Sequence, residues 1–212
     1  MYIPDDFKEV RTEEIERIIR EYPLACLVAN TPEGLVAAHI PLVLKGDIYL
    51  IGHLAKNNNM PSLLERDQEV MCIFRADEAY ISPKDYPQSA AKNKKVPTWN
   101  YQVVHVYGTI RFYNDQRSRL ASVGFLTKQV EKDLHGDEAW RMADAPLDYI
   151  MEQIEHITAF DVTITKVLAK SKIGQSDTKE ETDTVIESLE ERNEEGMAQA
   201  MRKWLGDVGE SK

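Results

Sequence analysis

The stretch that decides the fold runs from residue 24 to residue 53 and reads LACLVANTPEGLVAAHIPLVLKGDIYLIGH. It holds three apolar runs, separated by the turn sequences PEG at 32–34 and KGD at 45–47. Apolar runs of this length, bounded by proline, glycine and aspartate, are typical of β-strands. The connections are shorter than the dozen or so residues that a parallel crossover needs. The stretch therefore predicts an antiparallel meander.

Similar runs follow on the C-terminal side of this stretch. EVMCIF at 69–74 and AYIS at 79–82 predict two further strands, and a long strand is expected from Tyr101 to Tyr113. Alternation returns in AFDVTITKV at 159–167, which predicts the last strand. The predicted fold class is therefore mainly β with helices, with an antiparallel sheet closed into a barrel.

Helical periodicity occurs before, between and after these strands. The expected helices cover residues 13–22, a short piece near 61–65, a long segment from 115 to 134, a segment opened by Pro146, and the residues after the capping-box sequence TKEE at 178–181. Gly196 is expected to interrupt the last helix, whose second half can pack on the barrel or on a partner chain. We therefore expect a barrel domain at 1–178 and a C-terminal helical extension at 179–212.

The charge of the chain bears on its partners. Its 212 residues carry a formal net charge of −10, which does not support DNA as a partner, because nucleic-acid binding relies on a basic face. Half of that charge lies in residues 179–212, where ten acidic residues face five basic ones. A local basic patch around Lys92, Lys94 and Lys95 keeps DNA binding open.

The sequence shows no pattern typical of a secreted or membrane-spanning protein. The N-terminal sequence MYIPDDFKEV lacks a basic segment followed by an apolar one, and no apolar run approaches the ~18 residues of a membrane span. We expect a cytoplasmic protein without membrane contact. Cys26 and Cys72 lie inside apolar runs, where a thiol is typically a small buried hydrophobe. The five histidines lack the spacing of a zinc site, so no metal is predicted.

Polar residues are placed where strands end. GHLAKNNN at 52–59 offers a lysine ammonium, side-chain amides and backbone N–H groups to an anion such as phosphate. The alternative is a solvated loop in which asparagines tolerate turn dihedrals. His39 is expected either as a core histidine or as a functional one, and Pro41 indicates an edge, a bulge or an opening of the sheet.

The stretch VPTWNYQVVHVYGTI at 96–110 has an unusually polar and aromatic entrance. Alternation puts Trp99, Tyr101 and the following odd residues on one side, and Asn100, Gln102 and the following even residues on the other. From the sequence, neither side reads as a clean core face. Rings beside amides suit a flat heteroaromatic ligand, and they suit a homodimer interface equally well.

Taken in order, the segments GHLAKNN, AYISP and VPTWNYQVVHVYG resemble the PaiB family, described as FMN-binding negative transcriptional regulators. This family lies within the FMN-binding split-barrel group of pyridoxamine-phosphate-oxidase-like proteins. The match covers nearly the whole chain, from MYIPDDF through HIPL to KSKIGQS at 170–176. The resemblance implies a split antiparallel β-barrel that dimerises and holds FMN in clefts between its two subunits.

The resemblance also implies the site residues. GHLAKNN is similar to the turn that meets the cofactor phosphate, HIPL to the strand beside the isoalloxazine ring, and VPTWNY to the lining of the cleft. KSKIGQS reaches the cleft from the last strand of the same chain or of the partner. The cofactor-binding residues implied in this way are His39, Ile40, Pro41, His53, Lys56, Asn57, Asn58, Thr98, Trp99, Asn100, Tyr101, Lys172 and Gln175.

Three functions stay open. The resemblance implies a dimeric repressor of transcription, in the family's case of genes for sporulation and degradative enzymes. The alternative is an FMN-dependent oxidoreductase such as a flavin reductase, in which the flavin carries the redox chemistry. The sequence shows no obvious general acid or base beyond His39, His53 and His105, so no catalytic residue is assigned. A third is a scaffold with a decayed cofactor site. Asp85, Gly174 and Ser176 stand where the family usually shows tryptophan, serine and asparagine.

Overall fold

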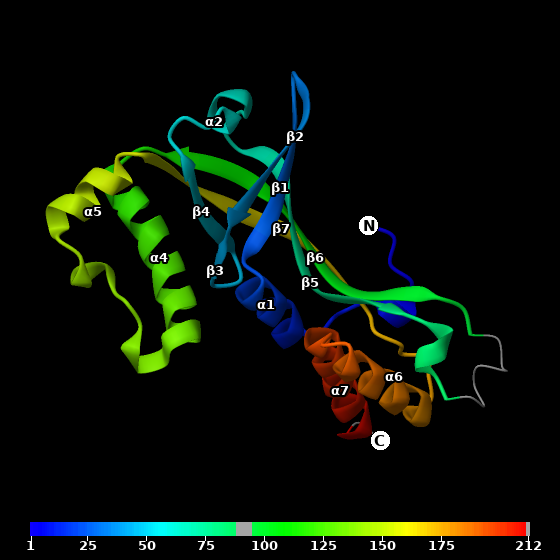
Figure 1. The fold of residues 1–212 in the computed structure, drawn as a ribbon. Coiled ribbons are helices and arrows are strands. Elements are labelled where there is room, and N and C mark those ends of the chain that lie inside the picture. Colours follow the sequence, from blue (N-terminus) through cyan, green and yellow to red (C-terminus); the bar gives the residue numbers. More distant parts are fainter. Residues whose placement is uncertain (88–94, 211–212) are drawn as a thin grey trace. The chain divides into compact units, whose positions relative to one another are not determined.

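The computed structural model describes residues 1–87 and 95–210. Within these residues, seven strands form one sheet in the order β2-β1-β5-β6-β7-β4-β3 (Figure 1). The strands are β1 (Leu24–Thr31), β2 (Gly34–Pro41), β3 (Val43–Lys45), β4 (Tyr49–Ala55), β5 (Gln68–Ile81), β6 (Thr98–Tyr113) and β7 (Ile157–Lys172). The α-helices are α1 (Thr12–Glu21), α2 (Met60–Leu63), α4 (Gln116–His135), α5 (Leu147–Ile154), α6 (Lys179–Glu191) and α7 (Glu195–Glu210). Short 3-10 helices are η1 (Asp5–Phe7), η2 (Pro83–Asp85), η3 (Gly136–Glu138) and η4 (Met142–Asp144).

The chain divides into two compact units. The helical unit comprises residues 1–10, 75–103 and 169–212, and the barrel unit comprises residues 11–74 and 104–168. Each of the three long strands β5, β6 and β7 contributes one end to each unit. The C-terminal helices thus share a unit with parts of three strands, and the predicted domain boundary at residue 178 stays a prediction.

The barrel unit contains the predicted meander. β1 pairs antiparallel with β2 from Leu24↔Pro41 to Thr31↔Gly34, and β4 pairs antiparallel with β3 and with β7. β2 and β3 lie at the two ends of the sheet order, yet only Leu42 separates them in the chain. The two ends of the order are therefore joined, as the predicted closed antiparallel sheet requires. Pro41 ends the edge strand β2, which is one of the positions that its missing N–H predicts.

Two elements differ from their predictions. The runs EVMCIF and AYIS belong to one strand, β5, because the polar residues Arg75–Glu78 continue the extended backbone instead of turning. Gly196 does not interrupt the last helix, since the break between α6 and α7 lies at 192–194, where Asn193 has a φ of 61°. Gly196 lies in the first turn of α7, where an added Cβ would stand 1.9 Å from Asp77 Oδ1.

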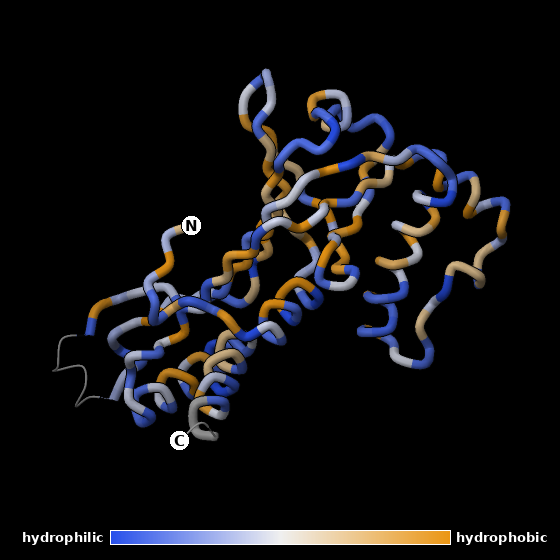
Figure 2. The backbone as a smooth tube through the Cα atoms, turned by 180° about the vertical axis from the view of Figure 1, so that it is seen from behind, coloured by the Kyte–Doolittle hydropathy of each residue, from blue (hydrophilic) through white to orange (hydrophobic). Residues whose placement is uncertain are grey.

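The helical unit has its own apolar core. The helices α6 and α7 bury one face each, and near the C-terminus in Figure 2 hydrophobic and hydrophilic residues alternate along α7. The buried members are Ala79, Ile81, Ile173, Val185, Ile186, Leu189, Met197, Ala198, Ala200 and Met201. The second half of the extension therefore packs on strand residues of its own chain. The predicted capping box is confirmed, because Glu181 N donates to Thr178 Oγ1 and Thr178 N donates to Glu181 Oε2.

Two findings concern the surface of the chain. None of the helices in the part of the chain that the structure describes is long and apolar enough to cross a membrane. Lys92 and Lys94 of the predicted basic patch lie outside the described residues. Lys95 lies within them, and its ammonium pairs with Asp177 at 2.8 Å and with Glu181 at 3.0 Å. At this lysine the positive charge is neutralised.

In the barrel unit, strands β6 and β7 approach each other closely at Gly108, and a substitution there tests their packing. A Cβ on Gly108 of β6 would stand 2.3 Å from the backbone oxygen of Thr163 and 2.6 Å from Val162 Cγ1. We expect Gly108→Ala to destabilise the protein by about 1–3 kcal/mol, because the strand backbone must move to admit the methyl group. Gly206→Ala in α7 is the control: nothing lies within 4 Å, and alanine favours a helix by about 0.5–1 kcal/mol. The free energy of unfolding of both variants is measured in urea. A Gly108→Ala protein as stable as the wild type would contradict this packing.

Candidate functional site

The entrance of β6 forms an aromatic pocket on the surface of the helical unit. Trp99 is 54% exposed, and its ring meets Tyr80 of β5 edge to face, with 6.0 Å between the ring centroids. A pocket of about 330 Å³ is lined by Arg75, Glu78, Trp99 and Tyr101. Two predicted site residues, Trp99 and Tyr101, thus share a pocket, as their positions on one side of the strand predict.

Lys172, at the end of β7, lies beside the same strand entrance. Its ammonium donates hydrogen bonds to Thr98 Oγ1 and to the backbone oxygen of Trp99, the latter at 2.9 Å. Burial lowers the pKa of Lys172 from its ordinary value. The structure therefore brings together the predicted residues Thr98, Trp99 and Lys172, and the lysine holds the strand entrance through neutral oxygen atoms.

The opposite face of β6 is a core face, which corrects the expectation that neither face is clean. The even-numbered residues from Asn100 to Ile110 are all buried. Asn100 is only 3% exposed, and its Nδ2 lies 3.8 Å from Met201 Sδ of α7. Helix packing on this face could not be read from β6 alone. Asn100 thus points away from the pocket that Trp99 lines.

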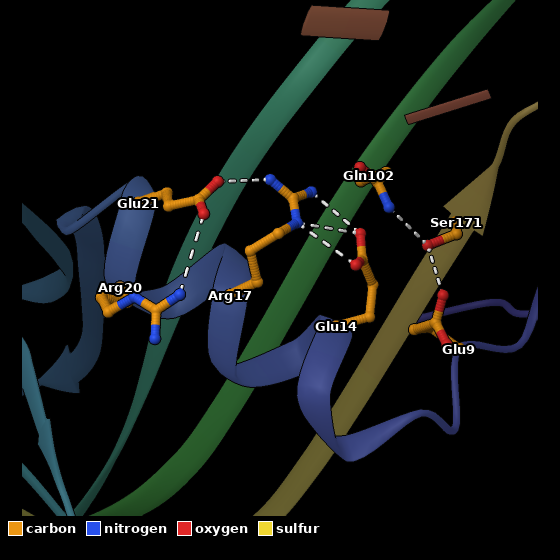
Figure 3. A network of polar contacts seen from close by, with 7 residues as sticks. All are labelled: Glu9, Glu14, Arg17, Arg20, Glu21, Gln102 and Ser171. Carbon is orange, nitrogen blue, oxygen red and sulfur yellow. Dashed lines mark hydrogen bonds and ion pairs between the residues drawn. The ribbon is translucent and has the colours of Figure 1, made fainter. Parts of the chain in front are cut away.

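Buried polar groups continue along this face. Gln102 Nε2 donates to Ser171 Oγ at 3.0 Å, and Ser171 Oγ donates to Glu9 Oε2 at 2.9 Å (Figure 3). Glu9 N also donates to the oxygen of Ala169 at 3.1 Å. These bonds fix the N-terminal segment against β7. Gln175 has a similar internal use, since its side chain bonds Ile173 N at 3.0 Å and the backbone oxygen of Ser171.

The second network in Figure 3 belongs to α1 of the barrel unit. Arg17 donates to Glu14 Oε1 at 2.9 Å and to Glu21 Oε2 at 2.6 Å. Burial lowers the pKa of Arg17, but the hydrogen bonds to Glu14 and Glu21 outweigh it and hold the pKa above its ordinary value. Pairs three and four residues apart face each other on a helix, so this network stabilises α1 itself.

The turn after β4 carries free donors on the barrel unit. Asn58 is used internally, since its Oδ1 accepts from Met60 N at 2.8 Å and its N donates to the oxygen of Ala55 at 2.9 Å. Lys56 and Asn57 are exposed, and their side chains make no hydrogen bond or ion pair to any described residue. An unpaired ammonium beside a free amide is a donor set that fits a phosphate.

The remaining predicted residues lie on strands of the same unit. His39 is exposed on β2, whereas Ile40 beside it is 3% exposed and belongs to the core. His53 on β4 is half-buried, and within the described residues its Nδ1 is buried without a hydrogen-bond partner. An orphaned buried nitrogen is costly unless a ligand or solvent satisfies it.

The predicted residues thus form two sets, one on each unit. Lys56, Asn57 and His53 supply polar groups on the barrel unit, and they suit a phosphate. Trp99 and Tyr101 supply rings on the helical unit, and they suit a flat ligand such as isoalloxazine. Residues fitting both halves of FMN are therefore present. Arg75 and Glu78 were missed because they lie in the segment of β5 that the sequence reads as a break. Tyr80 lies in the predicted strand AYIS, but no sequence signal marked it as a site residue.

Two of the three departures from the PaiB pattern have structural uses in this chain. Asp85 Oδ2 caps η2 by accepting from Ser82 N at 2.7 Å, and the same carboxylate binds Ser188 at 2.8 Å and Arg192 at 3.2 Å. Gly174 has a φ of 83°, in the left-handed region that favours glycine. Ser176 is exposed. Asp85 therefore stabilises the backbone of η2, and Gly174 allows the left-handed backbone conformation at its own position.

Gly174 starts a turn that depends on Asp177. Asp177 N donates to Gly174 O at 3.0 Å. Its carboxylate accepts from the hydroxyl of Tyr86 at 3.1 Å and from Lys95 at 2.8 Å. Burial and this carboxylate together raise the pKa of Tyr86 above its ordinary value. One carboxylate thus holds the side chains of two residues that flank segment 87–94.

Restoring the family's serine at position 174 tests this turn. We expect Gly174→Ser to destabilise the protein by about 1–3 kcal/mol, because a side chain is strained at positive φ. Its Cβ would also stand 2.9 Å from Asp177 Oδ2. Ser176→Asn restores the neighbouring family residue at an exposed site, and we expect a change within about 0.5 kcal/mol. Equal stability of the two variants in urea unfolding would refute the role assigned to Gly174.

Two half-buried histidines make stability depend on pH. Burial lowers the pKa of His53 and of His105, and in the described part of the chain the Nδ1 of each lacks a hydrogen-bond partner. The folded state then binds fewer protons than the unfolded state, so the free energy of unfolding falls as pH drops below about 6.5. We expect His53→Gln and His105→Gln to weaken this dependence between about pH 7.5 and 5.5, measured by urea unfolding. The exposed His135→Gln is the control, and three equal pH profiles would contradict the assignment.

Comparisons with known proteins concern the family and the fold of the chain. A family model described as "Putative FMN-binding domain" matches residues 1–166. The protease synthase and sporulation protein PAI 2 of Bacillus subtilis is 30% identical over 212 residues, which cover 97% of this chain and 98% of that protein. The match supports the resemblance to the PaiB family at the level of the whole chain.

Solved structures show the same fold. The FAD and heme binding protein from Mycobacterium smegmatis has a TM-score of 0.57 at 13% identity, covering 85% of this chain and 79% of its own. The flavocytochrome Anf3 from Azotobacter vinelandii has a TM-score of 0.56 at 14% identity, covering 78% and 69%. The predicted split antiparallel barrel is confirmed, and so is FMN as the predicted cofactor, through the family match. The chain therefore belongs to the FMN-binding domain family of split-barrel proteins.

Proposed function

We propose that this protein is a homodimeric FMN-binding protein that acts as a negative transcriptional regulator. The observation that carries the proposal is the correspondence along 97% of the chain with PAI 2, a protein named for protease synthesis and sporulation. A match of this extent includes the C-terminal helices as well as the barrel. Fold alone would not support a regulatory role, because one fold serves many functions.

FMN binding is proposed at the two sets of residues described above. The phosphate is assigned to Lys56 and Asn57, whose side chains are exposed and free of partners among the described residues. The ring is assigned to the side of Trp99 and Tyr101. When FMN is bound it supplies the redox and light-absorbing chemistry, while the chain supplies the cation, the amide and the aromatic wall.

A homodimer is proposed because each unit exposes large apolar side chains. Trp99 is 54% exposed on the helical unit, and Leu35 is 79% exposed on the barrel unit. Exposed aromatic and aliphatic residues are typical of interface cores. We propose that the homodimer holds FMN in clefts between its two subunits.

An FMN-dependent oxidoreductase is the second candidate, because a flavin ring that lies against the exposed Trp99 would keep its other face accessible to a second molecule. The net charge of −10 also favours a function that does not require broad contact with DNA. Oxidation of NADH or NADPH by the purified holoprotein, with a range of electron acceptors, separates this candidate from a regulator that uses flavin only as a bound ligand.

Flavin binding can be tested by absorption spectra and by titration with FMN and riboflavin. We expect Lys56→Gln to reduce the preference for FMN over riboflavin at least about tenfold, since one charge-assisted bond to phosphate contributes about 1.5–3 kcal/mol. Trp99→Ala should weaken the binding of both flavins, measured by titration, and the dimer, measured by sedimentation. Lys84→Gln and Trp140→Ala replace exposed residues outside both sets and should change neither. A colourless protein that does not bind added FMN would end the flavin proposal.

The regulatory role is tested with promoter DNA and with transcripts. We expect the wild-type protein to lower transcript levels of its target genes, and Trp99→Ala to relieve that repression if flavin binding is required. Gel shifts at several salt concentrations, with and without FMN, report direct contact with DNA. Absence of any specific shift, together with unchanged transcripts, would count against regulation.

A further inference from the structure

Two lysines of β7 lie on the surface of the helical unit that carries the aromatic pocket. Lys170 is 8% exposed, and its ammonium lies 5.0 Å from the ring centroid of Tyr101 and 5.8 Å from that of Phe7. Lys172, two residues on, donates to Thr98 Oγ1 and to the backbone oxygen of Trp99. Residues two apart in a strand point to the same side, so both ammonium groups belong to one face.

These lysines carry positive charge that the protein does not neutralise. Within residues 1–87 and 95–210, neither lysine forms an ion pair with a carboxylate, although the chain has 36 acidic residues. Buried charges are ordinarily paired, because removing an ammonium from water is costly. The rings of Phe7 and Tyr101 offset part of that cost through cation–π contacts. The Lys170–Lys172 pair is therefore an attractive position for an anion.

The adjacent pocket indicates what else the ligand carries. The ring of Tyr101 receives the Lys170 ammonium and also lines the pocket of about 330 Å³. That volume lies at the small end of the range of ligand pockets. Trp99 offers an exposed ring face, whereas Arg75 is already paired with Glu78. The pocket thus supplies flat apolar walls, and the lysine pair supplies the free charge.

We propose that Lys170 and Lys172 bind the anionic group of a planar aromatic ligand that lies against Trp99 and Tyr101. Two sources share this chemistry: the phosphate of FMN, which would then lie here instead of at Lys56 and Asn57, and a separate aromatic carboxylate that enters the pocket of the flavin-free protein. The FMN source rests on the proposed function, whereas the carboxylate source does not. Lys170 is not among the residues that the family pattern implies, and its burial without a carboxylate partner singles it out.

The first arm of the test uses the flavin-free, full-length protein and two probes of the same shape. 2-Naphthoate carries a carboxylate, and 2-naphthamide replaces it with a neutral amide. If the carboxylate is the source, we expect naphthoate to bind at least about tenfold more tightly by calorimetry, with a preference that falls as salt is added. Lys170→Gln and Lys172→Gln should each bring the ratio close to one. Lys166→Gln removes an exposed lysine of the same strand that lies over Tyr107, and it should leave the ratio unchanged.

The second arm repeats the comparison with FMN and riboflavin, which differ only in the phosphate. Loss of the FMN preference in both lysine variants, without a naphthoate preference in the wild type, assigns the pair to the flavin phosphate. Loss of the naphthoate preference with an unchanged FMN-to-riboflavin ratio assigns it to a separate acid. Ratios that survive in Lys170→Gln and Lys172→Gln, or binding of neither kind of anion by the wild type, overturn the proposal.

Two features keep the test decisive. A protein that binds naphthoate selectively but no flavin would contradict the FMN proposal alone, so the two failures can be told apart. If burial makes Lys170→Gln unstable in circular dichroism, Lys170→Arg retains the charge and should retain the preference. Lys172 is only half-buried, so Lys172→Gln is expected to fold, and the effect of removing a charge is then measured with that variant.

Discussion

The barrel unit depends on one covalent constraint: a single residue, Leu42, links the strands at the two ends of the sheet order. Leu42 is fully buried, its N–H donates to the oxygen of Pro23 at 2.9 Å, and its side chain fills the space above Gly52. An isolated sheet has two free edges, which are a liability for aggregation. Here the chain itself brings the two edges together, and the strands between them have little freedom in register.

The helical unit shows why one strand can serve two purposes. β6 presents alternate residues to opposite sides, so the face with Asn100 and Gln102 is covered by helices and buried polar bonds while the face with Trp99 and Tyr101 stays available. Binding groups are most precise when a packed scaffold holds them. The buried face of β6 therefore positions the rings that the proposed ligand contacts.

Features that depend on local patterns could be predicted from the sequence. The meander follows from apolar runs and turns, and the start of α6 follows from the capping box at Thr178. The predictions that were wrong concern features that depend on tertiary contacts. β5 continues through Arg75–Glu78 although its composition resembles a break, and no local signal says that α7 would bury Asn100. For the site, the motifs located Trp99, Tyr101 and Lys172 in one region, whereas Lys170 stands out only through its burial.

The carboxylate of Asp177 has a consequence for how this protein can vary. It holds the side chains of both Tyr86 and Lys95, so the two contacts share one group. A substitution that removes this carboxylate would therefore release both side chains at once. Because residues in one polar network do not act independently, substitutions at these three positions should have non-additive effects on the free energy of unfolding.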